Sequence, residues 1–178
     1  MLFKGQSTYN MNSCETIEVF YNLRTDLDKL TAASNITKII LDVTTENQNS
    51  YNILQLLLNT LYTISETDKN MELIIATFKL RLISILGFTP NIKECVNCKK
   101  TDNLSYFSLK DNGLKCEDCG KQDRSAIQML PETREGVRYS IIGPAKKLFS
   151  YTVPEQSIRE LEIISKLYLN EKLEREYK

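Results

Sequence analysis

Apolar side chains recur at helical spacing in three consecutive stretches of the first half of the chain. The first runs from about Thr25 to Val43, the second follows Ser50, and the third follows Asn70. Such a stripe is typical of an amphipathic helix whose apolar face packs in a core. The side chains expected in the core are Leu27, Leu30, Ala33, Ile36, Ile39, Ile40 and Val43, then Ile53, Leu54, Leu57, Leu58, Leu61 and Ile64, then Met71, Ile74, Phe78, Leu82, Ile85 and Leu86. Three such helices with short polar connections predict a bundle.

The ends of these helices are also marked in the sequence. Ser50 and Asn70 are polar residues of the kind that caps a helix N-terminus. Gly87 and Pro90 end the third helix, because glycine favours a left-handed C-terminal turn and proline cannot continue a helix.

Proline begins each of three further helical stretches in the last third of the chain. These residues are Pro131, Pro144 and Pro154. Two residue pairs near the last start have capping-box spacing, namely Thr152 with Glu155 and Ser157 with Glu160. In the last helix we expect one buried and one solvated face, with Ile158, Leu161, Ile164, Leu167 and Tyr168 inward and Glu160, Lys166, Lys172 and Arg175 in water. The charged tail that follows is expected to fray.

The first twenty residues have a different pattern. The stretch from Ser7 to Phe20 is rich in β-branched and aromatic residues with a weak alternation, which predicts one or two strands. An isolated strand pair is marginal in water. We therefore expect either that these strands pack on the helices or that a preceding sheet is missing from the chain.

Four of the five cysteines form two identical pairs, Cys95-Val-Asn-Cys98 and Cys116-Glu-Asp-Cys119, separated by seventeen residues. This spacing is typical of a zinc site with four thiolate ligands. The chain has no histidine, so cysteine is the only soft ligand available and no histidine-dependent catalytic mechanism is possible. Four thiolates leave no coordination position for water or substrate. The sequence therefore predicts one structural zinc ion.

The residues between the two cysteine pairs predict a β-hairpin. An alternating pattern over residues 104–109 is followed by the turn sequence Asp111-Asn112-Gly113, and a second strand leads to Cys116. Gly120 follows the second pair, where glycine can adopt a conformation that points backbone amides at thiolate sulfur. We interpret residues 92–124 as a zinc ribbon.

The cysteines have three other interpretations. Two disulfides would require an oxidising compartment, and the start of the chain lacks an apolar run of signal-peptide length. A thioredoxin-like pair would need a single exposed motif at a strand-to-helix junction. A thiol redox switch stays open as an enzymatic alternative. Cys14 is expected to be a small half-buried apolar side chain rather than a reactive thiol.

Charge gives little support for a nucleic-acid surface. The chain has 23 basic and 23 acidic residues, and no polybasic arm. Four thiolates and one zinc ion would take residues 92–124 from a formal charge of +1 to about −1. Any DNA contact there must come from the placement of Lys93, Lys99, Lys100, Lys110, Lys115, Lys121 and Arg124. No segment reaches the roughly 18 apolar residues of a membrane span.

The order of these features is informative as a combination. The third helix ends in Leu82-Ile-Ser-Ile-Leu-Gly87-Phe88-Thr-Pro90, directly before the first cysteine pair. Tyr106-Phe107-Ser108 and Gly113-Leu-Lys-Cys116 lead to the second pair. This combination resembles the bacterial RecO family of DNA repair and recombination proteins.

The resemblance covers nearly the whole chain. Ser157-Ile-Arg-Glu-Leu-Glu is similar to the C-terminal helix of the family. The stretch from Phe3 to Glu15 resembles the last strands of its oligonucleotide-binding (OB) barrel, and Leu23-Arg24-Thr-Asp26-Leu27 resembles its first helix. Because the family usually begins with a five-stranded OB barrel, the chain is expected to start within that barrel.

The predicted fold class is mainly α: a helical bundle with an inserted four-cysteine zinc ribbon and a remnant of the last OB strands. The predicted divisions are 1–20 for the remnant, 21–91 for the helical bundle, 92–124 for the ribbon, and 125–178 for a C-terminal helical segment that completes the bundle.

The resemblance implies a non-enzymatic recombination mediator in the bacterial cytoplasm, associated with the nucleoid. Such proteins act with RecR, load RecA onto single strands coated by the single-strand binding protein SSB, and anneal complementary strands. Much of the family's contact with DNA and RecR belongs to the barrel, so DNA binding by this chain stays open.

The resemblance also implies that the helical part docks the acidic, apolar C-terminal tail of SSB on a cationic rim beside an apolar groove. The candidate rim residues are Lys79, Arg81, Lys146 and Lys147, the last two close to Phe149. The alternative is a zinc-stabilised helical scaffold with a protein partner unrelated to DNA.

Overall fold

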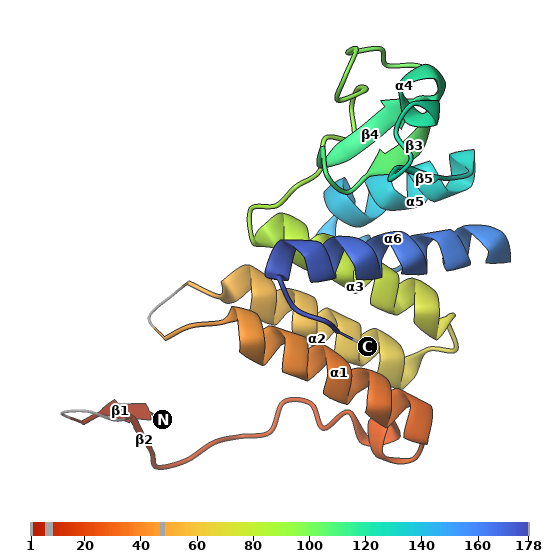
Figure 1. Cartoon of the computed structure of the whole chain (residues 1–178). Helices are drawn as coiled ribbons and strands as arrows, with labels where there is room; N and C mark the ends of the chain where they lie inside the picture. The colour runs from red at the N-terminus through yellow and green to blue at the C-terminus, as the bar shows by residue number, and fades with distance from the viewer. Residues whose placement is uncertain (1, 6–8, 47–48, 178) are drawn as a thin grey trace.

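A computed structural model describes residues 2–5, 9–46 and 49–177 of the chain (Figure 1). The first half contains a small strand pair, a short 3-10 helix and three long helices. In chain order these are β1 (Leu2–Lys4), β2 (Tyr9–Met11), η1 (Tyr21–Arg24), α1 (Leu27–Val43), α2 (Tyr51–Glu66) and α3 (Met71–Ile85). The second half contains β3 (Leu104–Ser108), β4 (Gly113–Cys116), α4 (Glu117–Lys121), β5 (Ile127–Gln128), α5 (Pro131–Ile142), η2 (Ala145–Lys147) and α6 (Glu155–Leu173). The described fold is therefore mostly helical, with a small antiparallel sheet.

The three predicted helices of the first half are present, and their ends follow the expected signals. The side chain of Asn70 accepts a hydrogen bond from the backbone N–H of Leu73, as an N-cap residue should. Ser50 occupies the N-cap position of α2. Gly87 follows α3 with a φ of 96°, a conformation that glycine adopts without a steric penalty.

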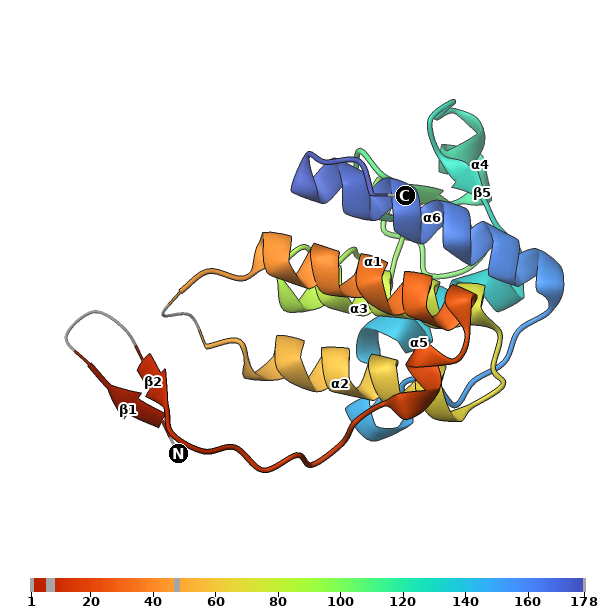
Figure 2. The same cartoon turned by 90° about the horizontal axis from the view of Figure 1, so that it is seen from below.

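Helix α3 is the centre of the bundle, in contact with α1, α2, α5 and α6 (Figures 1 and 2). Its sequence is apolar on nearly all sides, which is typical of a helix that is buried all round. Phe78 and Leu82 are fully buried. The polar positions Thr77 and Lys79 are buried as well, so α3 has no broad solvated face.

Five of the expected core positions are exposed. Leu27 and Leu30 of α1, Leu54 and Leu58 of α2, and Leu167 of α6 each leave at least 43% of their surface in water. The predicted stripes were wider than the faces that the neighbouring elements cover. The prediction that these five residues lie in the core was wrong.

Residues between the cysteine pairs form the predicted hairpin. Strands β3 and β4 pair antiparallel, and Phe107 lies opposite Leu114. Asn112 in the turn has a φ of 54°, as the turn sequence predicted. A third strand that the sequence did not reveal, β5, pairs with the other edge of β3. The hairpin lies on α5 and α6 at one end of the molecule (Figure 1).

The sheet and the helices share one core. Phe107 of β3 is fully buried. Its ring makes an edge-to-face contact with the ring of Tyr168 of α6, with the two centroids 5.3 Å apart and the two ring planes at 83°. The Tyr168 hydroxyl donates a hydrogen bond to the Phe88 carbonyl at 3.0 Å. A single side chain of α6 therefore joins the sheet to the turn that follows α3.

The start of α6 differs from the prediction. Pro154 is the N-cap residue, and neither predicted capping box forms. Ser157 is inside the helix and fully buried. The Glu160 carboxylate, which we expected in water, accepts hydrogen bonds from the Leu130 backbone N–H at 2.8 Å and the Thr133 hydroxyl at 2.6 Å. It caps the start of α5 instead of its own helix.

The C-terminal tail packs against the bundle, and the prediction that it frays was wrong. Tyr177 is only 6% exposed, and its hydroxyl donates a hydrogen bond to Asp42 of α1 at 3.2 Å. Arg175 forms an ion pair with the same carboxylate at 3.0 Å. The Tyr177 backbone N–H is bound by Asn170 at 3.0 Å.

The strand pair β1 and β2 lies apart from the helices (Figures 1 and 2). Leu2 lies opposite Met11 and Lys4 opposite Tyr9 in an antiparallel register. The segment that follows, residues 12–19, is extended and exposed, and it includes Cys14, which we expected to be half-buried. Of the stretch predicted to form strands, residues 7 and 8 lie outside the described residues. That this hairpin is the end of an OB barrel stays a prediction.

In the described part of the chain, no helix combines the length and the apolar character that crossing a membrane requires.

Candidate metal centre

The two cysteine pairs meet at the end of the hairpin away from its turn, where Cys116 of β4 lies opposite Leu104 of β3. The four Sγ atoms of Cys95, Cys98, Cys116 and Cys119 all lie within 4.8 Å of one another, and those of Cys98 and Cys116 are 3.5 Å apart. An ion bound tetrahedrally at about 2.3 Å from each sulfur holds the sulfurs about 3.8 Å apart. The arrangement fits one metal ion. All five cysteines lie in the described residues and are free thiols, so the structure contains no disulfide between them.

The first cysteine pair is held in a tight backbone turn. The Cys95 N–H donates to the Lys100 carbonyl at 2.7 Å, and the Lys99 N–H donates to the Cys95 carbonyl at 3.0 Å. Lys99 has a φ of 66°, in the left-handed region. The Val96 N–H donates to Leu114 of β4 at 2.9 Å, which ties this turn to the strand that carries the second pair.

The second cysteine pair lies at the start of a short helix. Cys116 is the N-cap residue of α4, and Cys119 is inside that helix. Gly120 is also helical and does not have a positive φ. That backbone amides near it point at thiolate sulfur stays a prediction. Glycine is needed there for space, because a Cβ would lie 2.2 Å from the ring of Tyr106. The left-handed residue occurs after the first pair, at Lys99.

Without a metal ion, the four thiols have very different affinities for a proton. Burial raises the pKa of the Cys95 thiol, but backbone N–H groups, that of Cys98 first, outweigh burial and lower it to about 6. Hydrogen bonds with the thiols of Cys116 and Cys98 raise the pKa of Cys119 to about 12. The surroundings therefore favour the thiolate at Cys95 and the protonated thiol at Cys119, and a metal ion must displace thiol protons to bind.

Most lysines of residues 92–124 are already paired with carboxylates. Lys99 binds Glu94, Lys100 binds Asp118, and Lys121 binds Glu117, at 2.6–3.0 Å. A cation whose charge is already matched offers little to a phosphate. The observed pairing fits a solvated mixed-charge rim better than a nucleic-acid surface.

Lys115 is different, because it is buried. Its side chain is 3% exposed and its ammonium lies 2.5 Å from Asp111 and 2.6 Å from Asp123. The Ser108 hydroxyl lies 3.2 Å and 3.3 Å from the same two carboxylates. Hydrogen bonding with Lys115, ahead of the contribution of Ser125, holds the pKa of Asp123 well below its usual range. This network fastens the hairpin turn to the segment after α4, and no local pattern of residues predicts it.

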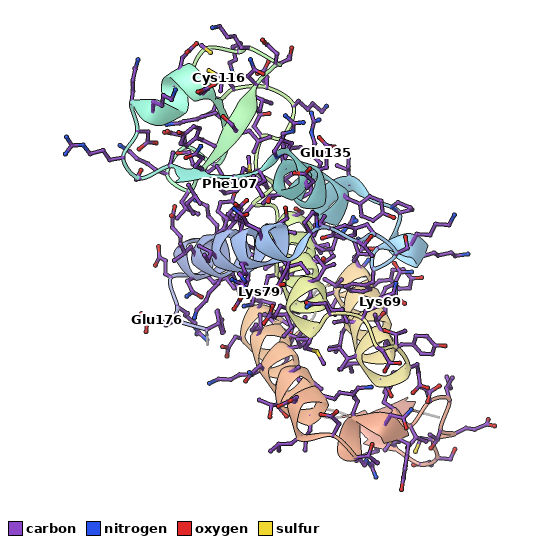
Figure 3. All side chains as sticks on the ribbon, turned by 90° about the vertical axis from the view of Figure 1, so that its right-hand side faces the viewer. Lys69, Lys79, Phe107, Cys116, Glu135 and Glu176 are labelled. Carbon is purple, nitrogen blue, oxygen red and sulfur yellow. The ribbon has the colours of Figure 1, made fainter. Side chains whose placement is uncertain are left out.

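The four predicted rim cations do not form one exposed group. Lys79, which is labelled in Figure 3, lies on α3 and is only 4% exposed. Burial first, then the nearby Lys166, lowers its pKa. It therefore does not form part of an exposed rim in this structure. Arg81 is half-buried, and its guanidinium donates to the Gly143 carbonyl. Lys146 and Lys147 are exposed on η2.

The segment that carries Lys146 and Lys147 is fastened at its backbone carbonyls by side chains from several elements. Arg81 of α3 donates to Gly143, Asn59 of α2 to Ala145, Tyr139 of α5 to Lys147, and Lys69 to Phe149. The amino groups of both lysines are left on the surface. Sequence reasoning missed Lys69 and Asn59, because a polar residue that binds a distant carbonyl has no local pattern.

A cavity of about 250 Å³ lies beside this segment. It is lined by Arg81 together with the apolar side chains of Leu56, Ile85 and Leu148, and by Ala145 next to the two lysines. Its other lining residues are Asn52, Gln55 and Asn59. Three of the predicted cations therefore lie at or next to one cavity, and Lys79 does not line it.

Comparison with known proteins agrees with the described features. The family model described as "Recombination protein O C terminal" matches residues 24–178. The protein named DNA repair protein RecO from Acetivibrio thermocellus is 37% identical over 179 residues, which cover 99% of this chain and 71% of the relative. The proteins of the same name from a Thermoanaerobacter species and from Alkaliphilus metalliredigens are 32% and 31% identical to this chain, and each match covers 72% of the relative. The chain belongs to the RecO family of DNA repair proteins.

Proposed function

We propose that this chain is a non-enzymatic recombination mediator of the RecO type, which acts with RecR and SSB to load RecA on single-stranded DNA and to anneal complementary strands. Its place of action would be the bacterial cytoplasm, at the nucleoid. Family membership supports the role in DNA repair. The observation that carries the more specific proposal is the exposed lysine pair beside the cavity lined by Arg81.

The partner that this surface would bind is the C-terminal tail of SSB. An acidic tail with apolar residues needs cations at the rim and an apolar cavity beside them. Lys146 and Lys147 supply the exposed charge, and Leu56, Ile85 and Leu148 supply the apolar lining. Because the carbonyls of the segment are already bound, little order would have to be gained when a tail docks.

Arg81 would pair with a carboxylate of the tail at the wall of the cavity. Burial lowers the pKa of its guanidinium, which means that the surroundings disfavour the cation. Its Nε is buried and has no hydrogen-bond partner in the described part of the chain. A carboxylate placed in the cavity would offset the cost of burying this charge.

Zinc is the metal that we propose for the four cysteines. A set of four thiolates at this spacing suits zinc, and it leaves no open coordination position. The ion would be held by Cys95, Cys98, Cys116 and Cys119, and it would stabilise the hairpin. With four protein ligands, the ion would have no coordination position for a substrate. This supports a mediator that makes and breaks no bond.

A tail-binding measurement tests the proposal. A fluorescent peptide with the SSB tail sequence should bind the purified chain, and replacing Lys146→Glu and Lys147→Glu together should weaken binding at least about tenfold. The matched control is Lys38→Glu with Lys110→Glu, which makes the same change in net charge at exposed positions of α1 and of the hairpin turn. Equal losses in both variants would mean that net charge, and not this surface, governs binding.

The same measurement addresses the alternative of a scaffold unrelated to DNA. A chain that is folded and zinc-loaded but does not bind the tail peptide would contradict the proposed partner and favour that alternative. Replacing zinc with cobalt and recording the thiolate charge-transfer bands tests the ligand set. A spectrum without four-thiolate character would contradict the metal proposal.

A further inference from the structure

The solvent-facing side of α2 is apolar where a surface helix is normally charged. Tyr51, Leu54, Leu58 and Tyr62 lie on successive turns of one face, and they are 67%, 52%, 45% and 54% exposed. We call these four residues the α2 stripe. The opposite face of the helix, which includes Ile53, Leu56, Thr60 and Ile64, is buried in the bundle. A helix that is apolar on both faces is expected to be covered on both.

The position of α2 in the fold leaves this stripe free. Figure 2 shows α2 at the edge of the bundle, where the extended N-terminal segment passes outside it. Residues 12–19 of that segment are all exposed themselves. The stripe is also separate from the cavity beside Arg81, which uses Asn52, Gln55 and Asn59 of the same helix.

We propose that the α2 stripe is an interface between two copies of this chain, paired with their α2 helices antiparallel. Tyr51 precedes Leu54 by three residues and Tyr62 follows Leu58 by four, so the order of side chains along the helix is nearly the same in both directions. A two-fold axis near the middle of α2 would place Tyr51 of one copy against Tyr62 of the other, and Leu54 against Leu58, twice. Such a self-complementary patch is what an isologous dimer interface requires.

Charge favours a second copy over a charged partner. The sequence contains no acidic or basic residue between Glu46 and Glu66, so the stripe offers nothing to attract a cationic or anionic surface. Two copies of an uncharged face bring no like charges together across the centre of the interface. The aromatic and aliphatic composition is typical of the core of an interface rather than its rim.

The area predicts a weak dimer. The exposed fractions correspond to roughly 400 Å² per copy, so a pair would bury roughly 800 Å² in total. Patches of this size on a protein surface are often functional, but stable interfaces bury more than about 1,200 Å². We therefore expect dissociation constants in the micromolar range, between about 1 and about 200 µM.

Sedimentation equilibrium of the zinc-loaded full chain over that concentration range tests the proposal. The wild type should shift from monomer to dimer, and Leu58→Glu should weaken association at least about tenfold. Leu41→Glu is the matched control, because Leu41 is 70% exposed on α1 and outside the stripe. It should dimerise like the wild type. Circular dichroism confirms that each variant is folded.

A mixing experiment tests the antiparallel geometry. Leu54→Lys and Leu58→Glu should each be largely monomeric alone. An equimolar mixture should form heterodimers, because the introduced lysine faces the introduced glutamate while the other leucine pair stays intact. A failure of the mixture to associate would refute the antiparallel pairing. A wild type that stays monomeric at about 200 µM would overturn the proposal and leave the stripe to another protein or to the further residues of longer relatives.

Discussion

Replacing Phe107→Ala should show that the cysteine hairpin and the helical bundle unfold as one unit. Phe107 is fully buried in β3 and its ring contacts Tyr168 of α6, which in turn holds the Phe88 carbonyl. Removal of a buried phenylalanine side chain costs about 3–5 kcal/mol, and the lost edge-to-face contact is part of that cost. We expect a loss of about 4 kcal/mol in the free energy of unfolding, a large share of the stability of a domain of this size.

Urea unfolding followed by the helical circular dichroism signal measures this loss. With a denaturant dependence of about 2 kcal/mol per molar urea, the midpoint should fall by about 2 M. The metal content should stay the same as in the wild type, because the cysteines are not changed. Phe88→Ala is the matched control: its side chain is 44% exposed, so its loss should be below about 1 kcal/mol.

The refuting result is a small effect on the helices. If Phe107→Ala lowers the helical midpoint no more than Phe88→Ala does, the hairpin and the bundle have separate cores. The inference that Tyr168 connects the core of the hairpin to the core of the bundle would then be wrong.

Three further predictions concern the hairpin itself. Cys116→Ser should lose the metal and make residues 92–124 sensitive to protease, whereas a wild-type metal content by elemental analysis would contradict the metal site. Gly120→Ala should cost about 1–3 kcal/mol in urea unfolding, since its Cβ would overlap a neighbouring ring, and unchanged stability would refute that reason. Lys115→Met should destabilise the chain by about 2 kcal/mol near pH 7, a value reduced from that of a fully buried pair because the acidic partners are partly exposed. Because the pKa of Asp123 is depressed in the folded state, this carboxylate contributes to stability above its unfolded pKa of about 3.9, and the contribution is lost as the pH falls. The free energies of unfolding of wild type and Lys115→Met should therefore differ less near pH 3 than near pH 7.

The sequence located the helices and the cysteine cluster because both depend on local spacing. Asn70 and Gly87 mark the ends of α3 through their own backbone preferences, and the structure confirms both. The two Cys-x-x-Cys pairs needed only a hairpin between them to bring four sulfurs together. These signals lie within a few residues, so no knowledge of distant contacts was required.

Predictions failed where a distant element decides the outcome. Lys79 has the sequence context of an exposed helix lysine, but α3 is covered on nearly all sides. Glu160 was expected in water and instead caps α5, and the tail was expected to fray and instead binds Asp42. In each case the partner is 25 or more residues away in the sequence, where spacing carries no signal.

What the sequence by itself determined is the set of elements, the ligands of the candidate metal site and the family, because these follow from residue types at short separations. The tertiary structure alone decided which face of each helix is covered. It buried Lys79, exposed Leu54 and Leu58, and placed Lys146 and Lys147 beside the cavity of Arg81. The physical reason is that burial depends on which elements pack together, and a helix has the same sequence whether or not a neighbour covers it.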